Sequence, residues 1–279
     1  GYFYANSLSL AKRFAEAITV LDKQLQLHPG NTMLLRSKIL TLAETKDYAK
    51  ALETLKQLKP ADAQTAEMLF IKGRVLFLNG QIPPSIDAFN ESYQQAPTNE
   101  TAMFIAEIYS KDYSHQRAVS FLEQHFAKQP ASGNLKVFYA NLLLQSDKEK
   151  SFRLYDEILA ESPDNYIVLN NYAWELAEAN RLTEAEQYIE KALKQAPKHP
   201  DVLDTYGKVL LKMDKLPDAI KAFEQSLAIR PEHNLVKLNY AEALLRSGDK
   251  AKARSVIAGV SNPDSSLTKR LEELNSSLN

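Results

Sequence analysis

The sequence predicts an all-α solenoid, in which one chain folds into a stack of similar helical hairpins. Prolines recur with separations of 68, 33, 33, 34 and 34 residues, and 68 is twice 34: Pro29, Pro97, Pro130, Pro163, Pro197 and Pro231. A fixed period of this length is typical of stacked-repeat proteins. Small residues and helix-period apolar residues follow the same period, which indicates two helices in each unit.

A small residue stands twelve positions before each of these prolines: Ala17, Ser85, Ala118, Ser151, Ala185 and Ala219. The same register gives Ala51 in the unit whose proline is displaced to Pro60, and Ala253 in the last unit. Together with Ala173 or Gly207 on the preceding helix, such residues let two helix axes approach closely. We therefore expect them at the seam of each hairpin.

The stretch from residue 169 to residue 197 shows both helices of one unit. Its first apolar stripe, at i, i+3, i+4 and i+7, consists of Leu169, Tyr172, Ala173 and Leu176. After a break at 179–181, a second stripe consists of Ala185, Ile189, Ala192 and Leu193. Pro197 then ends the second helix, because proline cannot continue it.

A unit of about 34 residues built from two such helices resembles the tetratricopeptide repeat. The resemblance covers essentially the whole chain and is strongest over residues 165–231. It implies one right-handed superhelical domain. The expected repeats are 1–31 (truncated), 32–65, 66–98, 99–131, 132–164, 165–199, 200–233 and 234–262, with a capping helix at 263–279. Two repeats, ending at Pro130 and Pro163, are one residue short, which leaves the register over 32–164 open.

The two ends of the chain give different expectations. The last segment, PDSSLTKRLEELNSSLN, places Leu267, Leu271 and Leu274 on one face behind Asp264 or a neighbouring serine as N-cap, so it is expected to cap the solenoid. Gly1 falls inside the first helix of a repeat. We therefore expect this chain to be a fragment of a protein that continues N-terminally.

Composition excludes several classes of partner and site. The formal net charge is -1, with no long run of one sign, so nucleic acid and anionic membranes are not expected partners. No apolar run approaches the roughly 20 residues of a membrane span. There is no cysteine, which excludes disulfides and thiolate metal sites.

No catalytic motif is recognisable. The five histidines include no H-E-x-x-H pair, and no phosphate-binding glycine loop or G-x-S-x-G elbow is present. His28, His199 and His233 stand at turns between units, where a solvated polar residue is ordinary. We therefore expect no metal, no cofactor and no enzyme activity.

Trp174 is the only tryptophan, and its position on the helix points away from the seam of its own hairpin. At about 100° per residue from Leu169, Trp174 lies near 140°, whereas the apolar stripe centres near 350°. In the tetratricopeptide architecture this face lines the concave groove. The equivalent positions run Leu40, Arg74, Glu107, Asn141, Trp174, Lys208, Glu242, and beside them Arg36, Phe70, Met103, Val137, Asn170, Asp204, Leu238.

These columns mix aromatic, amide and charged groups, which suits an extended peptide. The residues expected to bind it are Arg74, Asn141, Asn170, Asn171, Trp174, Asp204, Lys208 and Asn239. An alternative stays open, because Phe70, Met103, Val137 and Leu238 could form core between repeats and Trp174 could lie flat on its neighbour.

The carboxylate clamp of chaperone-binding family members is incomplete here. Asn141 and Asn171 match two of its asparagines, but Val137 replaces the lysine, and Asp201 and Thr205 replace the basic pair. Thr205 likewise interrupts an asparagine ladder between Asn171 and Asn239.

The favoured function is a non-catalytic scaffold that binds a protein or peptide in the groove. The alternatives are a self-associating structural solenoid and a carbohydrate-binding module. Residues 170–174 (NNYAW) and 204–210 (DTYGKVL) are also similar to bacterial tetratricopeptide lipoproteins of exopolysaccharide and PEP-CTERM loci. That resemblance implies a periplasmic or outer-membrane setting with polysaccharide-system partners; without it, a cytoplasmic setting is expected.

Overall fold

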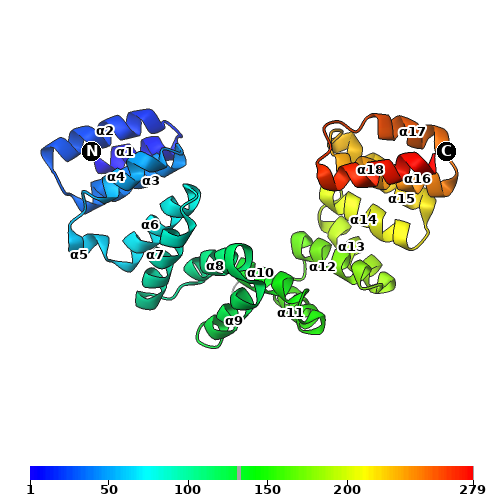
Figure 1. The fold of residues 1–279 in the computed structure, drawn as a ribbon, viewed down its shortest axis with the longest axis horizontal. Helices are drawn as coiled ribbons and strands as arrows, with labels where there is room; N and C mark the ends of the chain where they lie inside the picture. The colour runs from blue at the N-terminus through cyan, green and yellow to red at the C-terminus, as the bar shows by residue number, and fades with distance from the viewer. Residues whose placement is uncertain (131–132, 279) are drawn as a thin grey trace. The chain divides into compact units, whose positions relative to one another are not determined.

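The computed structural model describes residues 1–130 and 133–278. Within these residues every regular element is a helix and no strand is present, so the predicted all-α class is confirmed (Figure 1). The chain forms two compact units, residues 1–146 and 147–279. The expected repeat boundary at 131/132 and the last residue of the expected cap, 279, lie outside the described residues.

The first unit consists of helix pairs joined by short turns. Its helices are α1 (Tyr2–Leu10), α2 (Phe14–Leu27), α3 (Thr32–Glu44), α4 (Tyr48–Leu55), α5 (Pro60–Ala63), α6 (Ala66–Leu78), α7 (Ile82–Gln95), α8 (Asn99–Ile108), the π-helical turn η1 (Tyr109–Tyr113), α9 (His115–Phe126) and α10 (Gly133–Leu143). The displaced Pro60 begins the short α5, at a position where a missing N–H costs no hydrogen bond.

The second unit has the same construction. Its helices are α11 (Lys148–Glu161), α12 (Tyr166–Glu178), α13 (Leu182–Gln195), α14 (Pro200–Lys212), α15 (Leu216–Ile229), α16 (Asn234–Ser247), α17 (Lys250–Ala258) and α18 (Ser265–Ser277). Side-chain caps start several of them; the Asn165 carboxamide, for example, accepts a hydrogen bond from the Val168 N–H at 3.3 Å.

Most hairpin turns share one backbone conformation. One residue in each has a positive φ, between 59° and 89°: Lys12, Lys46, Gly80, Asn180, Asp214 and Gly248. In the last of these turns the Asp249 N–H donates to the Leu244 carbonyl, which satisfies an open helix end. The two short repeats have no such residue in their hairpin turns, and the first of them uses η1 instead. The two repeats that are one residue shorter than the others therefore have a different hairpin turn.

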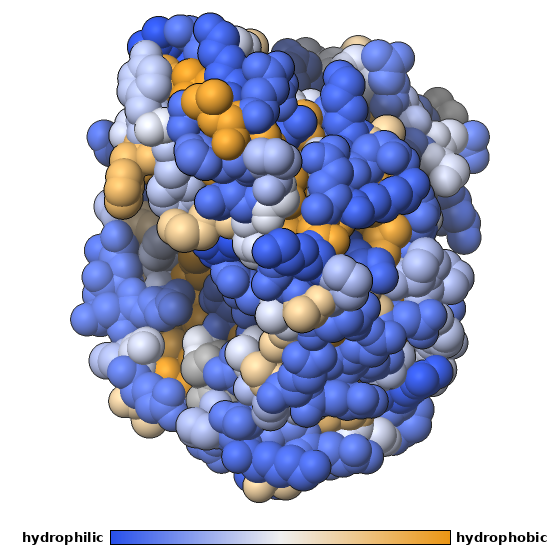
Figure 2. Space-filling model, turned by 90° about the vertical axis from the view of Figure 1, so that its left-hand side faces the viewer, coloured by the Kyte–Doolittle hydropathy of each residue, from blue (hydrophilic) through white to orange (hydrophobic). Residues whose placement is uncertain are grey.

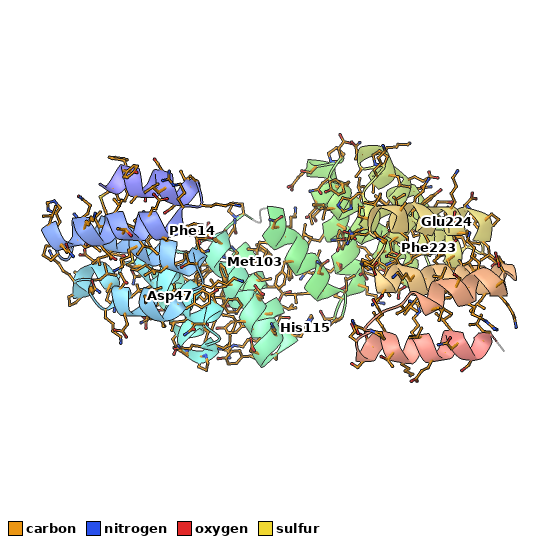
Figure 3. The ribbon with its side chains drawn as sticks, turned by 90° about the horizontal axis from the view of Figure 1, so that it is seen from above. Phe14, Asp47, Met103, His115, Phe223 and Glu224 are labelled. Carbon is orange, nitrogen blue, oxygen red and sulfur yellow. The ribbon has the colours of Figure 1, made fainter. Side chains whose placement is uncertain are left out.

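The small residues that recur with the repeat lie at the seams. All eight are 0% exposed: Ala17, Ala51, Ser85, Ala118, Ser151, Ala185, Ala219 and Ala253. Phe223, labelled in Figure 3, is fully buried. A Cβ added to Gly207 on the facing helix would lie 2.6 Å from its ring, so this position also requires a residue without a side chain. Close approach of the two axes thus requires small side chains on both helices.

Helix α18 caps the end of the second unit, as predicted. The Asp264 carboxylate accepts hydrogen bonds from the N–H groups of Ser266 and Leu267, at 3.0 Å each. Leu274 and Leu278 are buried against the core, with Leu267 and Leu271 beside them. The apolar face of α18 therefore covers apolar surface that α16 and α17 would otherwise expose, and its polar face remains in solvent.

Candidate partner-binding groove

A groove of about 280 Å³ lies in the second unit, across α12, α14, α16 and α18. We call it the Trp174 groove. It is lined by Trp174, Lys208, Leu211, Lys212, Leu235, Asn239, Glu242, Arg246 and Arg270. Three of these, Trp174, Lys208 and Glu242, occupy one column of the repeat, so the register brings successive first helices to a common surface.

The half-buried Trp174 forms one wall of this groove. Its ring lies 4.0 Å from the Lys208 ammonium and 5.9 Å from that of Lys212, measured to the ring centroid. A cation over an indole face contributes on the order of 0.5–2 kcal/mol. The contact with Lys208 therefore stabilises the orientation of the indole beside the groove.

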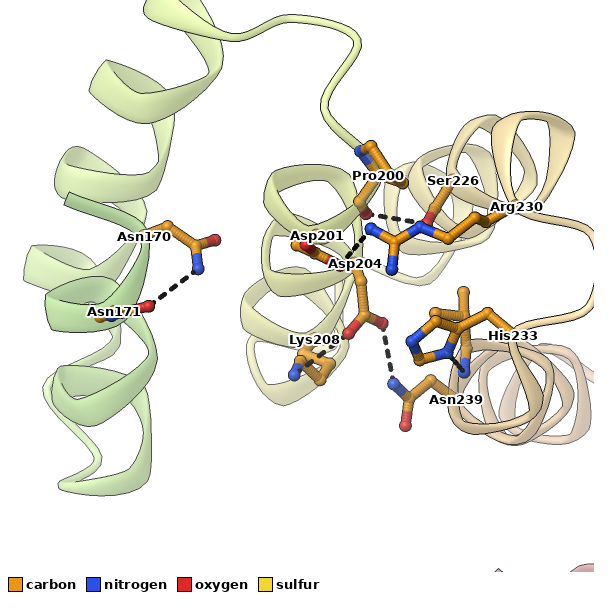
Figure 4. Close-up of polar contacts among 11 residues, drawn as sticks. Asn170, Asn171, Pro200, Asp201, Asp204, Lys208, Ser226, Arg230, His233 and Asn239 are labelled. Atoms are coloured by element: carbon orange, nitrogen blue, oxygen red, sulfur yellow. Dashed lines mark hydrogen bonds and ion pairs between the residues drawn. The ribbon is translucent and has the colours of Figure 1, made fainter. Parts of the chain in front are cut away.

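Asp204 connects two neighbouring first helices, α14 and α16. Its carboxylate pairs with the Lys208 ammonium at 3.2 Å and accepts a hydrogen bond from the Asn239 side-chain N–H at 2.9 Å (Figure 4). Asp204 and Asn239 are 7% and 2% exposed. Their polar atoms thus satisfy each other and position Lys208, rather than facing solvent.

Four cations line the Trp174 groove, and each has a carboxylate partner. Besides Lys208 with Asp204, the pairs are Lys212 with Glu178 at 3.0 Å, Arg246 with Asp214 at 2.8 Å and Arg270 with Glu242 at 2.7 Å. Of the four carboxylates, Glu242 alone lines the groove among the residues the structure describes. The lining of the groove therefore contains four cationic residues and one acidic residue, and each cation is paired with a carboxylate.

A second hollow, of about 430 Å³, contains the two asparagines that precede Trp174. It is lined by Tyr166, Ile167, Asn170, Asn171, His199, Asp201 and Val202. The Asn170 amide N–H donates to the Asn171 carboxamide oxygen at 3.3 Å (Figure 4). The Asn170 Oδ1 is buried and accepts no hydrogen bond within residues 1–130 and 133–278. A buried acceptor of this kind costs on the order of 1–3 kcal/mol.

The other two predicted residues, Arg74 and Asn141, belong to the first unit. Arg74 lies in a narrow crevice with Leu40, and its guanidinium is 5.9 Å from the Phe70 ring centroid. Asn141 is exposed on α10. The column beside them is mixed: Leu238 is 0% exposed, whereas Phe70, Met103 and Val137 are half-buried, and the Phe70 ring lies 5.7 Å from that of Phe104 between ring centroids.

Six residues of the Trp174 groove were not among the predicted binding residues: Glu242, which the sequence analysis placed in a column, and Leu211, Lys212, Leu235, Arg246 and Arg270, which it did not name. Lys212 and Arg246 follow Lys208 and Glu242 by one helical turn, so the helix period carried a signal for them. Arg270 comes from the cap helix, and no repeat column includes it.

Strongly perturbed side chains lie elsewhere in the second unit. Burial raises the pKa of Tyr155 and Tyr172, whose rings stack at 4.9 Å. Burial, with Asp156 nearby, raises the pKa of Tyr188 to about 12. Tyr155 and Tyr172 are neutral, buried phenols, and Tyr188 is half-buried. Across the described part of the chain, no cluster of three metal-ligating side chains occurs, and no helix has the length and apolarity to cross a bilayer.

Comparison with known proteins agrees with the hairpin architecture. A tetratricopeptide repeat family model matches residues 90–258, and a second matches residues 8–71. None of the curated proteins compared with the chain matches it.

Several solved structures share the fold at low sequence identity. A tetratricopeptide repeat protein from Parabacteroides merdae has a TM-score of 0.66 at 16% identity, covering 77% of this chain and 86% of its own. The C-terminal part of a repeat-containing protein from Cytophaga hutchinsonii has a TM-score of 0.67 at 18% identity, covering 86% and 99%. PilW, a type IV pilus biogenesis factor, has a TM-score of 0.62 at 17% identity, covering 69% and 90%.

The first family model alone spans more than half of the chain, and the solved relatives have the same helical-hairpin fold. The chain belongs to the tetratricopeptide repeat family, whose members are generally non-catalytic scaffolds for protein interaction.

Proposed function

We propose that this protein is a non-catalytic scaffold that binds an acidic, extended segment of a partner protein in the Trp174 groove. The observation that carries the proposal is the indole wall beneath Lys208, within a groove lined by four cations and one carboxylate. Aromatic and arginine side chains are the groups that most often dominate interface energies.

The chemistry of the groove favours a segment with both acidic and apolar residues. Leu211, Leu235 and the indole offer apolar contact, while Lys212, Arg246 and Arg270 offer charge. Each cation is already paired, so a partner carboxylate shares it rather than meeting a bare charge. The electrostatic part of the affinity should therefore be modest and should weaken with salt.

A peptide titration tests the proposal directly. Two synthetic peptides of alternating sequence, one with glutamate and leucine and one with lysine and leucine, are titrated while Trp174 fluorescence is recorded. We expect saturable binding of the acidic peptide only, weakened about tenfold by Lys212→Glu, which corresponds to roughly 1.4 kcal/mol. Lys221→Glu, an exposed exchange on α15 outside the groove, is the matched control. Equal binding of both peptides, or equal loss in both variants, would contradict the proposal.

A second candidate is self-association through α1. This helix exposes Phe3 by 82%, Tyr4 by 58% and Leu10 by 87%, which is unusual for large apolar side chains. The face drawn in Figure 2 is mostly hydrophilic, with apolar side chains gathered in separate patches. Light scattering over a concentration series should show mass increasing with concentration, and the double exchange Phe3→Ser, Leu10→Ser should abolish it. A constant monomer mass would remove this candidate.

The cellular setting is proposed from sequence resemblance alone. Similarity to the exopolysaccharide-associated lipoproteins suggests an envelope location and polysaccharide-system partners. The full-length precursor sequence tests this, since a lipobox cysteine near its start supports the location and its absence removes the support.

A further inference from the structure

A wide hollow lies in the first unit, away from the predicted columns. Its volume is about 670 Å³, within the range of roughly 300–1,000 Å³ common for ligand sites. We call it the Lys72 hollow. It is lined by Ala49, Leu52, Glu53, Leu55, Lys56, Ala63, Gln64, Lys72, Leu76, Asn79 and Gln81.

The hollow borders a short second helix; another second helix, α17, is also short, with 9 residues. Helix α4 has 8 residues, whereas α2, α7, α13 and α15 have 14. After α4 the chain turns into α5 at Pro60 instead of continuing along α6. The apolar residues Leu52 and Leu55 of α4 and Leu76 of α6 line an open space between the two helices.

The charge across this seam is reversed relative to other repeats. The seventh residue of a first helix usually meets an acidic residue on the preceding second helix. Lys38 pairs with Asp22 at 2.7 Å, and the hydroxyls of Tyr139 and Tyr240 donate to Glu123 and Glu224 at 3.2 and 2.6 Å. In α8 the corresponding pair is apolar, Ile105 and Phe89.

In α6 the same position is Lys72, and the residue at the same spacing on the preceding segment is Lys56. Lys56 pairs with Glu53 at 2.6 Å on the exposed surface. No hydrogen bond or ion pair reaches the Lys72 ammonium from any residue within 1–130 and 133–278. Two lysines and one carboxylate thus border an apolar hollow where other repeats supply an acid.

We propose that the Lys72 hollow binds a single-chain amphipathic anion of the fatty-acid type. The carboxylate lies between Lys72 and Lys56 and replaces the acidic residue that this repeat lacks. The hydrocarbon chain lies along the half-buried Leu52 and Leu55 and reaches the edge of Leu76, all of which line the hollow. Both the cationic border and the apolar floor are used by a ligand of this class, and a small inorganic anion would use the border only.

Calorimetric titration with dodecanoate, kept below its micelle concentration, tests the proposal. We expect one saturable site per chain and at least tenfold weaker binding of the neutral analogue dodecanol. Lys72→Gln should weaken dodecanoate binding about tenfold, whereas Lys23→Gln, an exposed lysine on α2 outside the hollow, should leave it unchanged. Circular dichroism confirms that both variants fold. The groove variant Lys212→Glu should retain full dodecanoate binding, because its site is a different one.

Dodecyl phosphate distinguishes the source of the anion. Weaker binding than dodecanoate identifies a carboxylate ligand, and tighter binding that also depends on Lys72 identifies a phosphate headgroup on the same site. Equal dodecanoate binding by Lys72→Gln and wild type, or equal binding of dodecanol, would overturn the proposal. The proposal would also be overturned if the wild type were a dimer and Lys72→Gln were a monomer, because the hollow would then be occupied by a second copy of the chain.

Discussion

The Lys208 ammonium lies 4.0 Å from the centroid of the Trp174 ring, and the two residues come from successive first helices, α14 and α12. Because Trp174 is the only tryptophan, its fluorescence reports this contact without labelling. Trp174 and Lys208 occupy the same repeat column, and both line the Trp174 groove.

Removing the ammonium should be visible in that fluorescence. In Lys208→Met we expect a changed emission intensity and maximum, together with a loss of about 1 kcal/mol in unfolding free energy from the cation–π contact and the pairing with Asp204. Emission spectra and urea unfolding measure the two effects. Lys221→Met should leave both unchanged; an unaltered spectrum in Lys208→Met would mean that the contact does not persist in solution.

Replacing Asp204 with alanine should lower the unfolding free energy of the second unit by more than the loss of a few side-chain atoms would. In Asp204→Ala the buried Asn239 N–H loses its acceptor, which costs on the order of 1–3 kcal/mol. Asp204→Asn keeps an acceptor oxygen and should lose less. Urea unfolding of the two variants gives the comparison, and equal losses would argue against the hydrogen bond as the cause.

A methyl group at Gly207 should force the hairpin of α14 and α15 apart. The new Cβ would meet the Phe223 ring at 2.6 Å, so Gly207→Ala should lower stability by about 1–3 kcal/mol despite the better helix propensity of alanine. The smaller ring-free side chain in Phe223→Leu should recover part of that loss in the double variant. Additive losses in a double-mutant cycle would rule out the clash as the mechanism.

His125 should make the stability of the first unit depend on pH. It is 1% exposed, its ring nitrogens lie 2.6 Å from the Tyr93 hydroxyl and from the Asn99 carboxamide oxygen, and burial lowers its pKa. The unfolded imidazole titrates near pH 6.5. Above that value both states are neutral; as pH falls below it, only the unfolded state gains the proton, so stability falls.

Thermal unfolding at pH 7.5 and pH 5.5 tests this dependence. The wild type should lose stability between the two values, and His125→Gln should lose less over the same interval. His28→Gln, an exchange at an exposed histidine of the same unit, should behave like the wild type. The same pH difference in His125→Gln as in the wild type would exclude His125 as the source.

The cap helix should contribute measurably to the second unit. Leu274 is 8% exposed and packs against the core, so Leu274→Ala should cost about 2 kcal/mol. Lys269→Ala, on the exposed face of α18, should stay within about 0.5 kcal/mol of the wild type. Similar melting temperatures for the two variants would show that α18 is not held against the core.

Much of the fold was predictable because the residues that define each repeat recur periodically and act on near neighbours in the sequence. Helix stripes such as that of Leu169 and Leu176, the small seam residues and the Asp264 cap all depend on near neighbours in the sequence. The columns also predicted that Trp174 and Lys208 share a surface. The columns did not predict the hydrogen bond between Asn239 and Asp204, because it depends on how α14 and α16 pack together.

The sequence by itself determined the family, the hairpin order and the residues that successive first helices present. The tertiary structure decided which of those residues line a groove, where Arg270 of α18 joins residues of α12, α14 and α16. It also decided that a hollow beside the short α4 is bordered by Lys56 and Lys72. The physical reason is the range of the interactions: periodicity records contacts within a repeat, whereas grooves and hollows arise from packing between elements that the repeat pattern does not encode.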